Sequence, residues 1–594
     1  MNGRIKILTA MVFLLGLCII GRLFELQVLG RNFLGNEVYQ RKITEQLIPA
    51  NRGKIFIRDG QELYPVAINI NTYNLIVSPN EIIESGTNQE EYLEKIAPYL
   101  GLLEEISPSD QVLLIQENKE TSKLKFFLTR ISQKNDYYEL LRKDLTIEEV
   151  REIKELGLPG ISFETVPRRY YPEENIFGHL TGFVNLPLEC DQEICQGSVG
   201  QYGLEKFFNE ELSGQPGRRQ GENAGGLNYS ADDLVEPPRD GTDLVLTVDR
   251  AVQFFACQLL ERAVEEYQAS GGTIVVLDPK NGKIIALCNQ PDFNPNQYSQ
   301  VKNYSLFQNP AVNSSFEPGS IFKVITMASG LDSGKVTPET VYLDPGTIKI
   351  DGETINNVEN RTFGYQTMTG VLEKSINTGA VFVAQELGSS SFRNYLRKFG
   401  FGSLTRIELP DEASGDISNL EKKQKIYLAT ASFGQGITVT PIQIVNAVGA
   451  IANQGKLMKP YLIDSVIKDG QVIVQEPEFV RQVISPAAAS SLTAMMISAC
   501  ENGYGKKARV KGYYVAGKTG TAQVPDKSGY SSEEVIQSFV GFAPATDPKF
   551  VALVKFDSPK KGNFADSTAV PTFGKLAEFM LNYYNLQPDK PAED

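Results

Sequence analysis

Glu317-Pro318-Gly319-Ser320-Ile321-Phe322-Lys323 is the stretch from which the fold of this chain can be inferred. Pro318 and Gly319 precede an apolar run over residues 321–328, a pattern typical of the start of a helix. A serine in the first helical turn lies near free backbone N–H groups and the positive end of the helix dipole, which together stabilise a developing oxyanion. Lys323, one turn later, falls on the same face. The pattern predicts a nucleophilic serine whose base is a lysine.

The histidine content supports a lysine base. His179 is the only histidine in the sequence, and it lies in a strand-like segment far from any nucleophile candidate. We expect it to be a packed or surface residue, so a Ser-His-Asp triad is disfavoured. Zinc catalysis is also disfavoured because it needs three or four closely spaced ligands, and we expect neither a metal nor a cofactor. Lysine can act as the base when burial and a second cation lower its pKa, and Lys518 would be that cation.

A second element is Ser375-Ile376-Asn377. Ser375 could relay a proton between Lys323, Lys518 and a leaving amine, and Asn377 could hold the amide of a substrate. The alternative is an ordinary helix cap, because serine and asparagine are common there.

The third element, Lys518-Thr519-Gly520-Thr521, occurs once and lies in a segment that predicts a strand. Gly520 lacks the Cβ that would keep a substrate backbone from lying alongside. Lys518 with the hydroxyls of Thr519 and Thr521 suits a terminal carboxylate. An edge strand with a solvated lysine is the alternative.

The three elements are more informative together, in this order, than any of them is alone. Ser-x-x-Lys alone is uninformative, because it also occurs at Ser122, Ser299, Ser465 and Ser558. Together, Ser-x-x-Lys, a Ser-x-Asn element and Lys-Thr-Gly form the set found in penicillin-binding proteins and class A β-lactamases. We therefore expect Ser320, Lys323, Ser375, Asn377 and Lys518 to be catalytic, and Thr519, Gly520 and Thr521 to bind substrate.

The chain begins with a predicted membrane anchor. Residues 7–21 carry no charge, and the apolar character extends to residue 29, about 23 residues in all, which is enough for a helix to cross a bilayer. Arg4 and Lys6 precede it, so residues 1–6 would be cytoplasmic and everything after the anchor exported. Arg22 and Glu25 can pair near its outer end. A cleavable signal peptide is the alternative, but no small-x-small cleavage site follows.

The rest of the chain predicts a globular α/β protein. Residues 45–212 mix strand and helix patterns, with a capped acidic helix at 146–156. Residues 213–242 are rich in turn residues and predict a linker. Residues 243–586 begin and end with strands, at 273–277, 283–287, 538–542 and 550–556, around a helical middle, then a helix at 572–584. This order predicts one α/β domain whose sheet combines distant segments, followed by a polar tail at 587–594.

Net charge indicates which kinds of partner the chain can bind, and cysteine content bears on whether it contains disulfides. A net charge of −14 argues against nucleic acid, which needs clustered basic residues. The six cysteines show no framework spacing. Cys190 and Cys195 could pair in an oxidising compartment, and two free thiols are the alternative.

On these residues the sequence resembles the class B penicillin-binding proteins over nearly its whole length. Further resemblance is carried by residues 243–249, 278–286, 291–296, 433–437 and 440–443 in the catalytic half, and by residues 52–55, 168–172 and 203–205 in the half that resembles the family's pedestal, or dimerisation, domain. The order Arg58-Asp59-Gly60 departs from the family pattern. Residues 517–523 and 538–544 resemble the division-associated branch, with the elongation branch as the alternative.

The resemblance implies a fold and an activity. The fold would be an antiparallel sheet flanked by helices, as in penicillin-binding proteins and β-lactamases, preceded by a mixed α+β pedestal and a single membrane helix. The activity would be D,D-transpeptidation of peptidoglycan stem peptides through a Ser320 acyl-enzyme that β-lactams also form, at the outer face of a bacterial inner membrane. The implied partners are a membrane glycan polymerase, division proteins and a second copy of the chain. Rival functions are a D,D-carboxypeptidase or β-lactamase, and a non-catalytic scaffold or β-lactam sensor.

Overall fold

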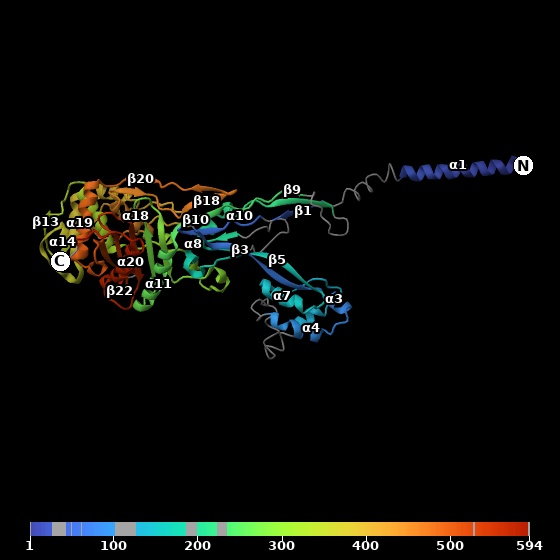
Figure 1. Cartoon of the computed structure of the whole chain (residues 1–594). Coiled ribbons are helices and arrows are strands. Elements are labelled where there is room, and N and C mark those ends of the chain that lie inside the picture. Colours follow the sequence, from blue (N-terminus) through green and yellow to red (C-terminus); the bar gives the residue numbers. More distant parts are fainter. Residues whose placement is uncertain are drawn as a thin grey trace. The chain divides into compact units, whose positions relative to one another are not determined.

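The computed structural model describes residues 2–25, 43–48, 50–60, 62–100, 126–185, 199–222, 234–526 and 529–591. Two units are described separately: the first comprises Met1–Gly53, Leu186–Val199 and Glu210–Thr242, and the second comprises Lys54–Asn185, Gly200–Asn209 and Asp243–Asp594. Figure 1 gives the order of the elements along the chain.

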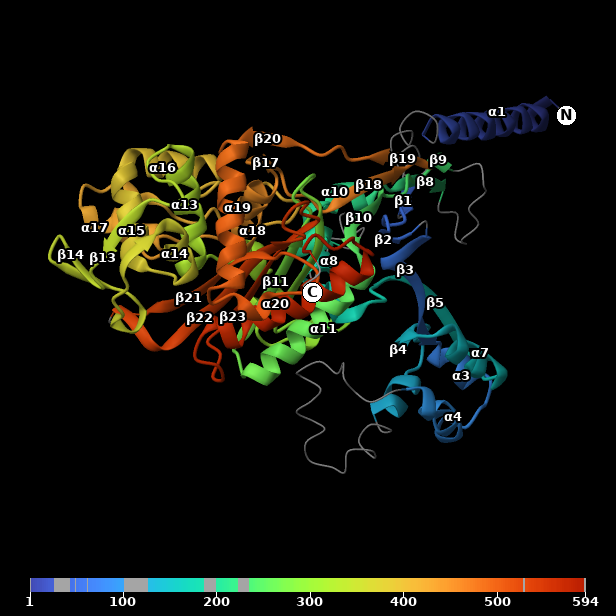
Figure 2. The ribbon, with the colours of Figure 1, turned by 60° about the vertical axis from the view of Figure 1, so that its left-hand side comes forward.

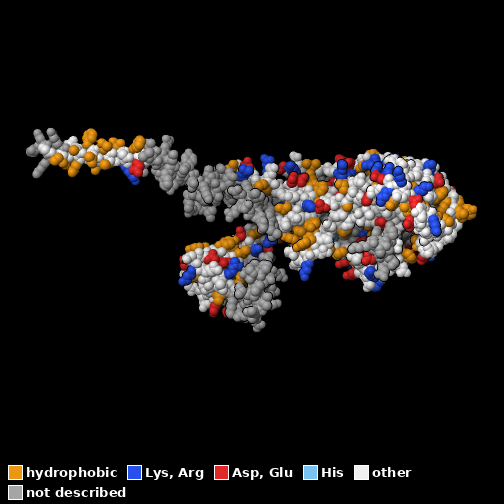
Figure 3. All heavy atoms as spheres, turned by 180° about the vertical axis from the view of Figure 1, so that it is seen from behind, with side chains coloured by type: hydrophobic (Ala, Val, Ile, Leu, Met, Phe, Trp, Pro, Cys, Tyr) orange, Lys and Arg blue, Asp and Glu red, His pale blue; other side chains and the backbone are white. Residues whose placement is uncertain are grey.

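The first unit contains the predicted anchor. Helix α1 (Asn2–Phe24) includes an 18-residue apolar stretch, Ile7–Phe24, with a mean hydropathy of 2.4. Figure 3 shows hydrophobic side chains along it, and none of this stretch is buried against protein. Arg22 donates to Glu25 at 2.7 Å, as predicted. At ~1.5 Å per residue the helix is long enough to cross a bilayer. Residues 26–29 of the predicted anchor lie outside the described residues.

The segment 213–242, for which turn residues predicted a linker, contains two strands in its described part. Strand β8 (Gly217–Glu222) pairs antiparallel with β1 (Ile43–Ile48) on one side and with β9 (Leu234–Glu236) on the other. Ladder hydrogen bonds form between backbones, so polar and glycine-containing segments can pair without an apolar side-chain pattern. The sequence therefore gave no strand signal here.

In the second unit, strands from the two halves of the chain form one sheet. Strand β10 (Asp243–Asp249) pairs in parallel with β2 (Ile55–Asp59) and antiparallel with β18 (Ile463–Lys468). Beyond β2 lie β3 (Glu62–Val77) and then β4 (Glu139–Leu145), and β18 pairs with β19 (Gln471–Val474). Strand β5 (Ile161–Tyr170) also pairs with β3.

Three helices cover the far end of β3, β4 and β5, as Figure 1 shows: α3 (Pro79–Glu84), α4 (Gln89–Ile96) and α7 (Ile147–Glu155). Their apolar side chains bury with those of the strands in one core that includes Leu75, Ile82 and Ile153. The acidic helix predicted at 146–156 is α7, and Thr146 caps it in a reciprocal capping box with Glu149.

Two sequence cues of the pedestal meet in a buried ion pair. Arg169 on β5 donates to Glu205 in α9 (Gly203–Phe207) at 2.7 Å, and the two side chains are 2% and 0% exposed. Arg169 also donates to Asn69 on β3 at 3.0 Å. The pair therefore ties α9 to the sheet.

The sheet of the C-terminal half has the strand order β12-β11-β23-β22-β21. Its strands are β11 (Gly271–Leu277), β12 (Ile284–Gln290), β21 (Ala516–Asp526), β22 (Gly529–Ala543) and β23 (Phe550–Asp557), all antiparallel to their neighbours. Segments more than 200 residues apart along the chain thus lie side by side, as the sequence predicted.

Helices flank this sheet (Figure 2): α11 (Arg250–Tyr267) and α20 (Ala569–Tyr583) share a core with the sheet, and α18 (Pro441–Ala452) and α19 (Pro486–Glu501) also pack against its strands. Between β12 and α18 the chain forms a helical lobe that includes α13 (Lys323–Asp332), α14 (Met368–Glu373), α15 (Asn377–Leu387), α16 (Ser389–Lys398) and α17 (Lys425–Ser432). The hairpin β14 (Thr347–Ile350) and β15 (Glu353–Asn356) shares a core with α15 and α17.

His179 lies in a short helix, α8 (Gly178–Thr181), so the strand-like interpretation of residues 179–184 was wrong for its first part. The strand β6 (Phe183–Asn185) begins only after Gly182. His179 is buried, its Nε2 lies 3.0 Å from the carbonyl oxygen of Leu306, and its ring packs on Phe293. Burial lowers the pKa of His179 to about 4, so the imidazole is neutral near pH 7. The prediction of a packed histidine is confirmed.

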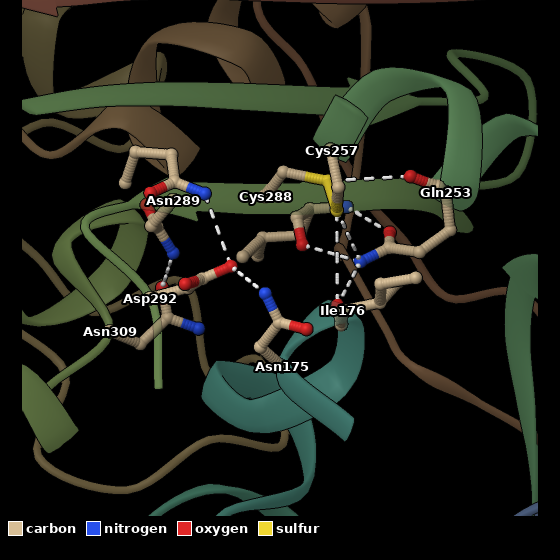
Figure 4. Close-up of a disulfide and its surroundings, with 10 residues drawn as sticks. Asn175, Ile176, Gln253, Cys257, Cys288, Asn289, Asp292 and Asn309 are labelled. Atoms are coloured by element: carbon tan, nitrogen blue, oxygen red, sulfur yellow. Dashed lines mark hydrogen bonds between the residues drawn. A yellow bond between two sulfur atoms is a disulfide. The ribbon is translucent and has the colours of Figure 1, made fainter. Parts of the chain in front are cut away.

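A disulfide joins Cys257 on α11 to Cys288 on β12 (Figure 4). Next to it, the Gln253 amide donates to the carbonyl oxygens of Ile176 and Leu287 and accepts the Leu287 N–H. The two cysteines are 31 residues apart and showed no motif, so the sequence did not predict this pairing. Cys190 and Cys195 lie outside the described residues.

Candidate active site

Ser320 lies in a tight helical turn that leads into α13. The turn, η7 (Gly319–Phe322), is a 3-10 helix in which residues three apart lie on the same side, so Ser320 and Lys323 share a face. Gly319 has a φ of +56°, which favours glycine, and its N–H donates to the carbonyl oxygen of Gly434 at 3.0 Å. The predicted helix start is confirmed.

Strand β21 runs alongside this turn. A Cβ on Gly520 would lie 2.8 Å from Ile321 Cγ2 and 2.5 Å from Ser538 Oγ, closer than such atoms can approach. A Cβ on Gly319 would lie 2.9 Å from the Cβ of Ala522. Glycine at both positions therefore allows the nucleophile turn and the strand to touch, which places Ser320 beside Gly520 and Thr521.

Ser375 lies between α14 and α15 with a φ of +53°, an uncommon backbone conformation for a residue other than glycine. Lys323 Nζ donates to the Ser375 carbonyl oxygen at 2.5 Å, to Asn377 Oδ1 at 2.7 Å and to Ser375 Oγ at 3.3 Å. Lys518 Nζ donates to the same Oγ at 2.9 Å. Ser375 Oγ thus bridges the two lysine amines.

Both lysines are almost completely buried, with exposed fractions of 1% for Lys323 and 2% for Lys518. Burial, together with the positive charge of Lys518, holds the pKa of Lys323 well below its usual range. Burial lowers the pKa of Lys518 to about 7, although the nearby Cys500 acts to raise it. A neutral amine is therefore accessible near neutral pH, as a base requires.

The segment 433–439 supports the nucleophile turn from the side of α17. Phe316 and Val439 exchange two backbone hydrogen bonds at 2.9 Å, and the Gly436 N–H donates to the Glu317 carboxylate at 2.9 Å. A Cβ on Gly434 would lie 2.3 Å from the carbonyl oxygen of Gly319. This contact explains why glycine is needed at Gly434 in a segment that the sequence resemblance had singled out.

The structure brings the eight predicted residues to one place: Ser320, Lys323, Ser375, Asn377, Lys518, Thr519, Gly520 and Thr521. Sequence reasoning missed Asp344, just before the β14–β15 hairpin, and Asn357, just after it; the side chains of both contact the start of α15. No motif marks them, because asparagine and aspartate beside turns are common. Among the described residues, no group of three or more His, Cys, Asp or Glu side chains is arranged to hold a metal.

Two protein-family domains match this sequence, and together they cover most of the chain. Residues 272–578 match the penicillin binding protein transpeptidase domain, and residues 47–246 match the penicillin-binding protein dimerisation domain. The chain is a class B penicillin-binding protein. The eight residues of the site lie within the segment that matches the transpeptidase domain.

Two relatives and one solved structure illustrate the similarity of this penicillin-binding protein to others. It is 31% identical over 592 residues to the probable peptidoglycan D,D-transpeptidase PbpC of Pseudomonas aeruginosa, covering 99% of this chain and 96% of the relative. It is 34% identical over 496 residues to the stage V sporulation protein D of Bacillus subtilis, covering 80% and 75%. Penicillin binding protein 2X from Streptococcus thermophilus shares the fold, with a TM-score of 0.74 at 24% identity over 91% and 80% of the two chains.

Proposed function

We propose that this penicillin-binding protein is a peptidoglycan D,D-transpeptidase that joins stem peptides through an acyl-enzyme on Ser320. The observation that supports this proposal most strongly is the position of Ser375 Oγ between the buried amines of Lys323 and Lys518. Such an arrangement can take a proton from one hydroxyl and deliver it to a leaving amine without any histidine.

In the first half-reaction, Ser320 Oγ attacks the carbonyl carbon between the last two D-alanines of a stem peptide. Neutral Lys323 accepts the hydroxyl proton as the C–O bond forms. When the C–N bond breaks, the departing D-alanine amine takes a proton from Ser375, which Lys323 or Lys518 replaces. In the second half-reaction an amine from a neighbouring strand attacks the ester carbonyl carbon and gives up a proton to the Ser375 and lysine groups. The bond between the acyl carbon and Ser320 Oγ then breaks, and Ser320 Oγ takes up that proton.

Charge placement supports the binding of this substrate. Lys518 and Thr519 lie on β21, and Lys518 Nζ is 3.2 Å from Thr519 Oγ1, so the ammonium and hydroxyl can hold the terminal carboxylate together with Thr521. Backbone N–H groups of Ser320 and Thr521 would form the oxyanion hole. A donor of this kind contributes roughly 3–4 kcal/mol to transition-state stabilisation.

The remaining parts of the chain suit a membrane-bound enzyme of the division branch. We assign residues 1–6 to the cytoplasm, 7–29 to a single-pass anchor in a bacterial inner membrane, 45–212 to the pedestal, 213–242 to the connection and 243–586 to the catalytic domain outside the membrane. The apolar helix α1 and the resemblance of residues 517–523 and 538–544 to the division-associated branch support this assignment. A membrane glycan polymerase, division proteins and a second copy of the chain are the partners that it implies.

Fluorescent penicillin tests the acylation step directly. Incubation of the full-length protein, followed by mass mapping of the modified peptide, is expected to place the label on Ser320 and to give no label in Ser320→Ala. A second assay, with lipid-linked strands polymerised in the same membranes, is expected to give cross-linked dimers. Trimmed peptides without dimers would instead identify a carboxypeptidase, and growth supported by Ser320→Ala would identify a scaffold.

A further inference from the structure

A buried polar cluster lies behind Ser375 and Asn377, outside the three sequence motifs. Its centre is formed by Asp344, the last residue of β13 (Val341–Asp344), and Asn357, which directly follows β15. Their exposed fractions are 1% and 3%. Polar side chains this deeply buried are retained only when their hydrogen bonds are satisfied, so the contacts of both residues define what the cluster does.

The helix that begins at Asn377 has no cap of its own. Its N-cap residue is Ile376, whose side chain cannot accept a hydrogen bond. Asn357 Oδ1 supplies the missing acceptor from outside the helix, accepting the backbone N–H of Asn377 at 3.0 Å and that of Thr378 at 3.2 Å. Two of the free N–H groups at the start of α15 are therefore satisfied by a residue 20 positions earlier in the chain.

Asp344 holds the Asn357 amide in this orientation. Asn357 Nδ2 donates to both oxygens of the Asp344 carboxylate at 3.0 Å, and to the Arg361 carbonyl oxygen at 3.0 Å. Asp344 also accepts the Thr378 hydroxyl at 2.6 Å. If the Asn357 amide were flipped, its NH₂ group would face the backbone N–H groups of Asn377 and Thr378, and its oxygen would face the Asp344 carboxylate. Only the observed orientation is therefore compatible with its neighbours.

Several hydrogen bonds stabilise the charge on Asp344. Burial acts to raise its pKa, but hydrogen bonds from the Thr378 hydroxyl, the backbone N–H groups of Gly346 and Phe363, and the Asn357 amide outweigh burial, and the pKa lies below its usual range. Asp344 is therefore a carboxylate, an acceptor only, at any pH at which the enzyme would work.

The capped residue is the one that contacts the base. Asn377 Oδ1 accepts from Lys323 Nζ at 2.7 Å, and Asn377 Nδ2 donates to the Asn356 carbonyl oxygen at 2.8 Å. Asn357 therefore fixes the backbone of Asn377, the adjacent Asn356 fixes its side chain, and Asn377 in turn fixes the amine of Lys323. The hydrogen bonds that connect Asp344 to Asn357, Asn357 to Asn377, and Asn377 to Lys323 are buried or partly buried. The bond from Asn377 to Asn356 is exposed to solvent.

We propose that Asn357 is a positioning residue for acylation: it caps α15 from the β14–β15 hairpin and thereby holds Asn377 against Lys323, with Asp344 fixing its orientation. This inference rests on the proposed acyl transfer at Ser320. Loss of the cap leaves two N–H groups without their acceptor, so the first turn of α15 shifts. A displacement of about 1 Å at a catalytic group can cost on the order of 100-fold in rate.

The test compares variants of the full-length protein by stopped-flow acylation with fluorescent penicillin, which separates the acylation rate constant from the dissociation constant of the non-covalent complex. Asn357→Ala is expected to lower the rate constant at least about 10-fold and to change the dissociation constant less than about 3-fold, because the residues proposed to bind the carboxylate do not contact Asn357. Thermal unfolding of each variant is measured in parallel.

Two matched controls separate positioning from stability. Among the contacts of the described residues, Asn356→Ala removes the side-chain hydrogen bond from Thr347 and leaves the backbone carbonyl that Asn377 uses. Thr378→Val removes a buried hydroxyl that donates to Asp344 at 2.6 Å and to Asn357 Oδ1 at 3.3 Å, but it leaves the N–H that Asn357 caps. Both are expected to retain the acylation rate within about 3-fold, even where Thr378→Val lowers the melting temperature.

A second substitution distinguishes capping of α15 from anchoring of the hairpin, even if Asn357→Ala folds poorly. Asn357→Asp keeps the oxygen that accepts the two N–H groups, but it loses the amide donor and places a carboxylate against Asp344. If the cap matters, Asn357→Asp acylates faster than Asn357→Ala. If Asn357 only anchors the hairpin through Asp344, Asn357→Asp is the slower of the two, and the proposal is wrong.

The remaining outcomes are equally decisive. A lowered melting temperature with an unchanged acylation rate constant in Asn357→Ala would show a merely structural role and overturn the inference. Wild-type protein that takes no label on Ser320 would overturn the proposed function, and with it the inference. Label on wild-type Ser320 with equal rates in all variants would overturn the inference alone.

Discussion

Lys518 Nζ lies 2.9 Å from Ser375 Oγ, although 143 residues separate the two in the sequence. The same hydroxyl lies 3.3 Å from Lys323 Nζ. A hydroxyl between two buried amines can accept a proton from one amine and pass a proton on to the other.

We expect a bell-shaped pH dependence of acylation from this pair. Burial and the charge of Lys518 both lower the pKa of Lys323, and burial lowers the pKa of Lys518 to about 7. Loss of the proton from Lys323 makes it a base, whereas loss of the proton from Lys518 near pH 7 removes the charge that binds a carboxylate. The second-order rate constant for acylation should therefore fall above pH 7.

Lys518→Arg provides the control for this pH dependence. A guanidinium stays charged throughout this range, so the variant should lose the alkaline limb even though its overall rate is lower. An alkaline limb with the same midpoint in wild type and variant would show that another group titrates.

Ser375→Ala should slow acylation and the release of the leaving amine, because it removes the only side-chain contact that the structure describes between Lys323 and Lys518. Loss of a positioned proton-transfer group typically costs about 100- to 10,000-fold. The acylation rate constant measures the effect. Ser389→Ala, which loses a serine hydrogen bond to Leu420 outside the site, is the control and should acylate like wild type.

Gly520→Ala should separate β21 from the nucleophile turn. The new Cβ would lie 2.5 Å from Ser538 Oγ and 2.8 Å from Ile321 Cγ2, so the strand or the turn must move. We expect at least about a 10-fold loss of acylation rate with a lower melting temperature. Adding Ser538→Ala removes one of the two contacts and should recover part of the stability. Wild-type acylation in the single variant would contradict the close approach described above.

Glu205→Ala should destabilise the pedestal, because it leaves the Arg169 guanidinium buried without its carboxylate. Breaking a buried ion pair costs about 3–5 kcal/mol, measured as the free energy of unfolding in urea. Lys206→Ala is the matched control, since it breaks an exposed pair with Asp411 and should cost less than about 1 kcal/mol. Equal effects of the two substitutions would show that burial of the Arg169 pair is not what matters.

Cys257→Ala should lower stability without abolishing acylation. The disulfide closes a loop of 31 residues between α11 and β12, and a cross-link of that size contributes about 3–4 kcal/mol through the unfolded chain. Urea unfolding of oxidised wild type, reduced wild type and Cys257→Ala measures this. Peptide mapping after alkylation without reductant should find Cys257 and Cys288 joined. Alkylation of both thiols in the untreated protein would exclude the bond.

The elements with strong local patterns were predictable. The apolar run of α1, the continuous apolar runs of β11 and β23, and the capping pair Thr146 and Glu149 are each recognisable from a few adjacent residues. The short helix around His179 and the polar strand β8 were not, because neighbours distant in the sequence decide them.

The sequence by itself determined which groups the site has: one serine beside a lysine, a serine and asparagine pair, and a lysine on a strand with a glycine. Only the tertiary structure decided that Ser375 Oγ lies between two amines, that burial lowers the pKa of both amines, and that Asn357 caps the helix of Asn377. The physical reason is that a motif specifies only the spacing of residues along the chain. Burial of an amine, and capping of a helix by a residue outside it, depend on which surfaces the folded chain brings into contact.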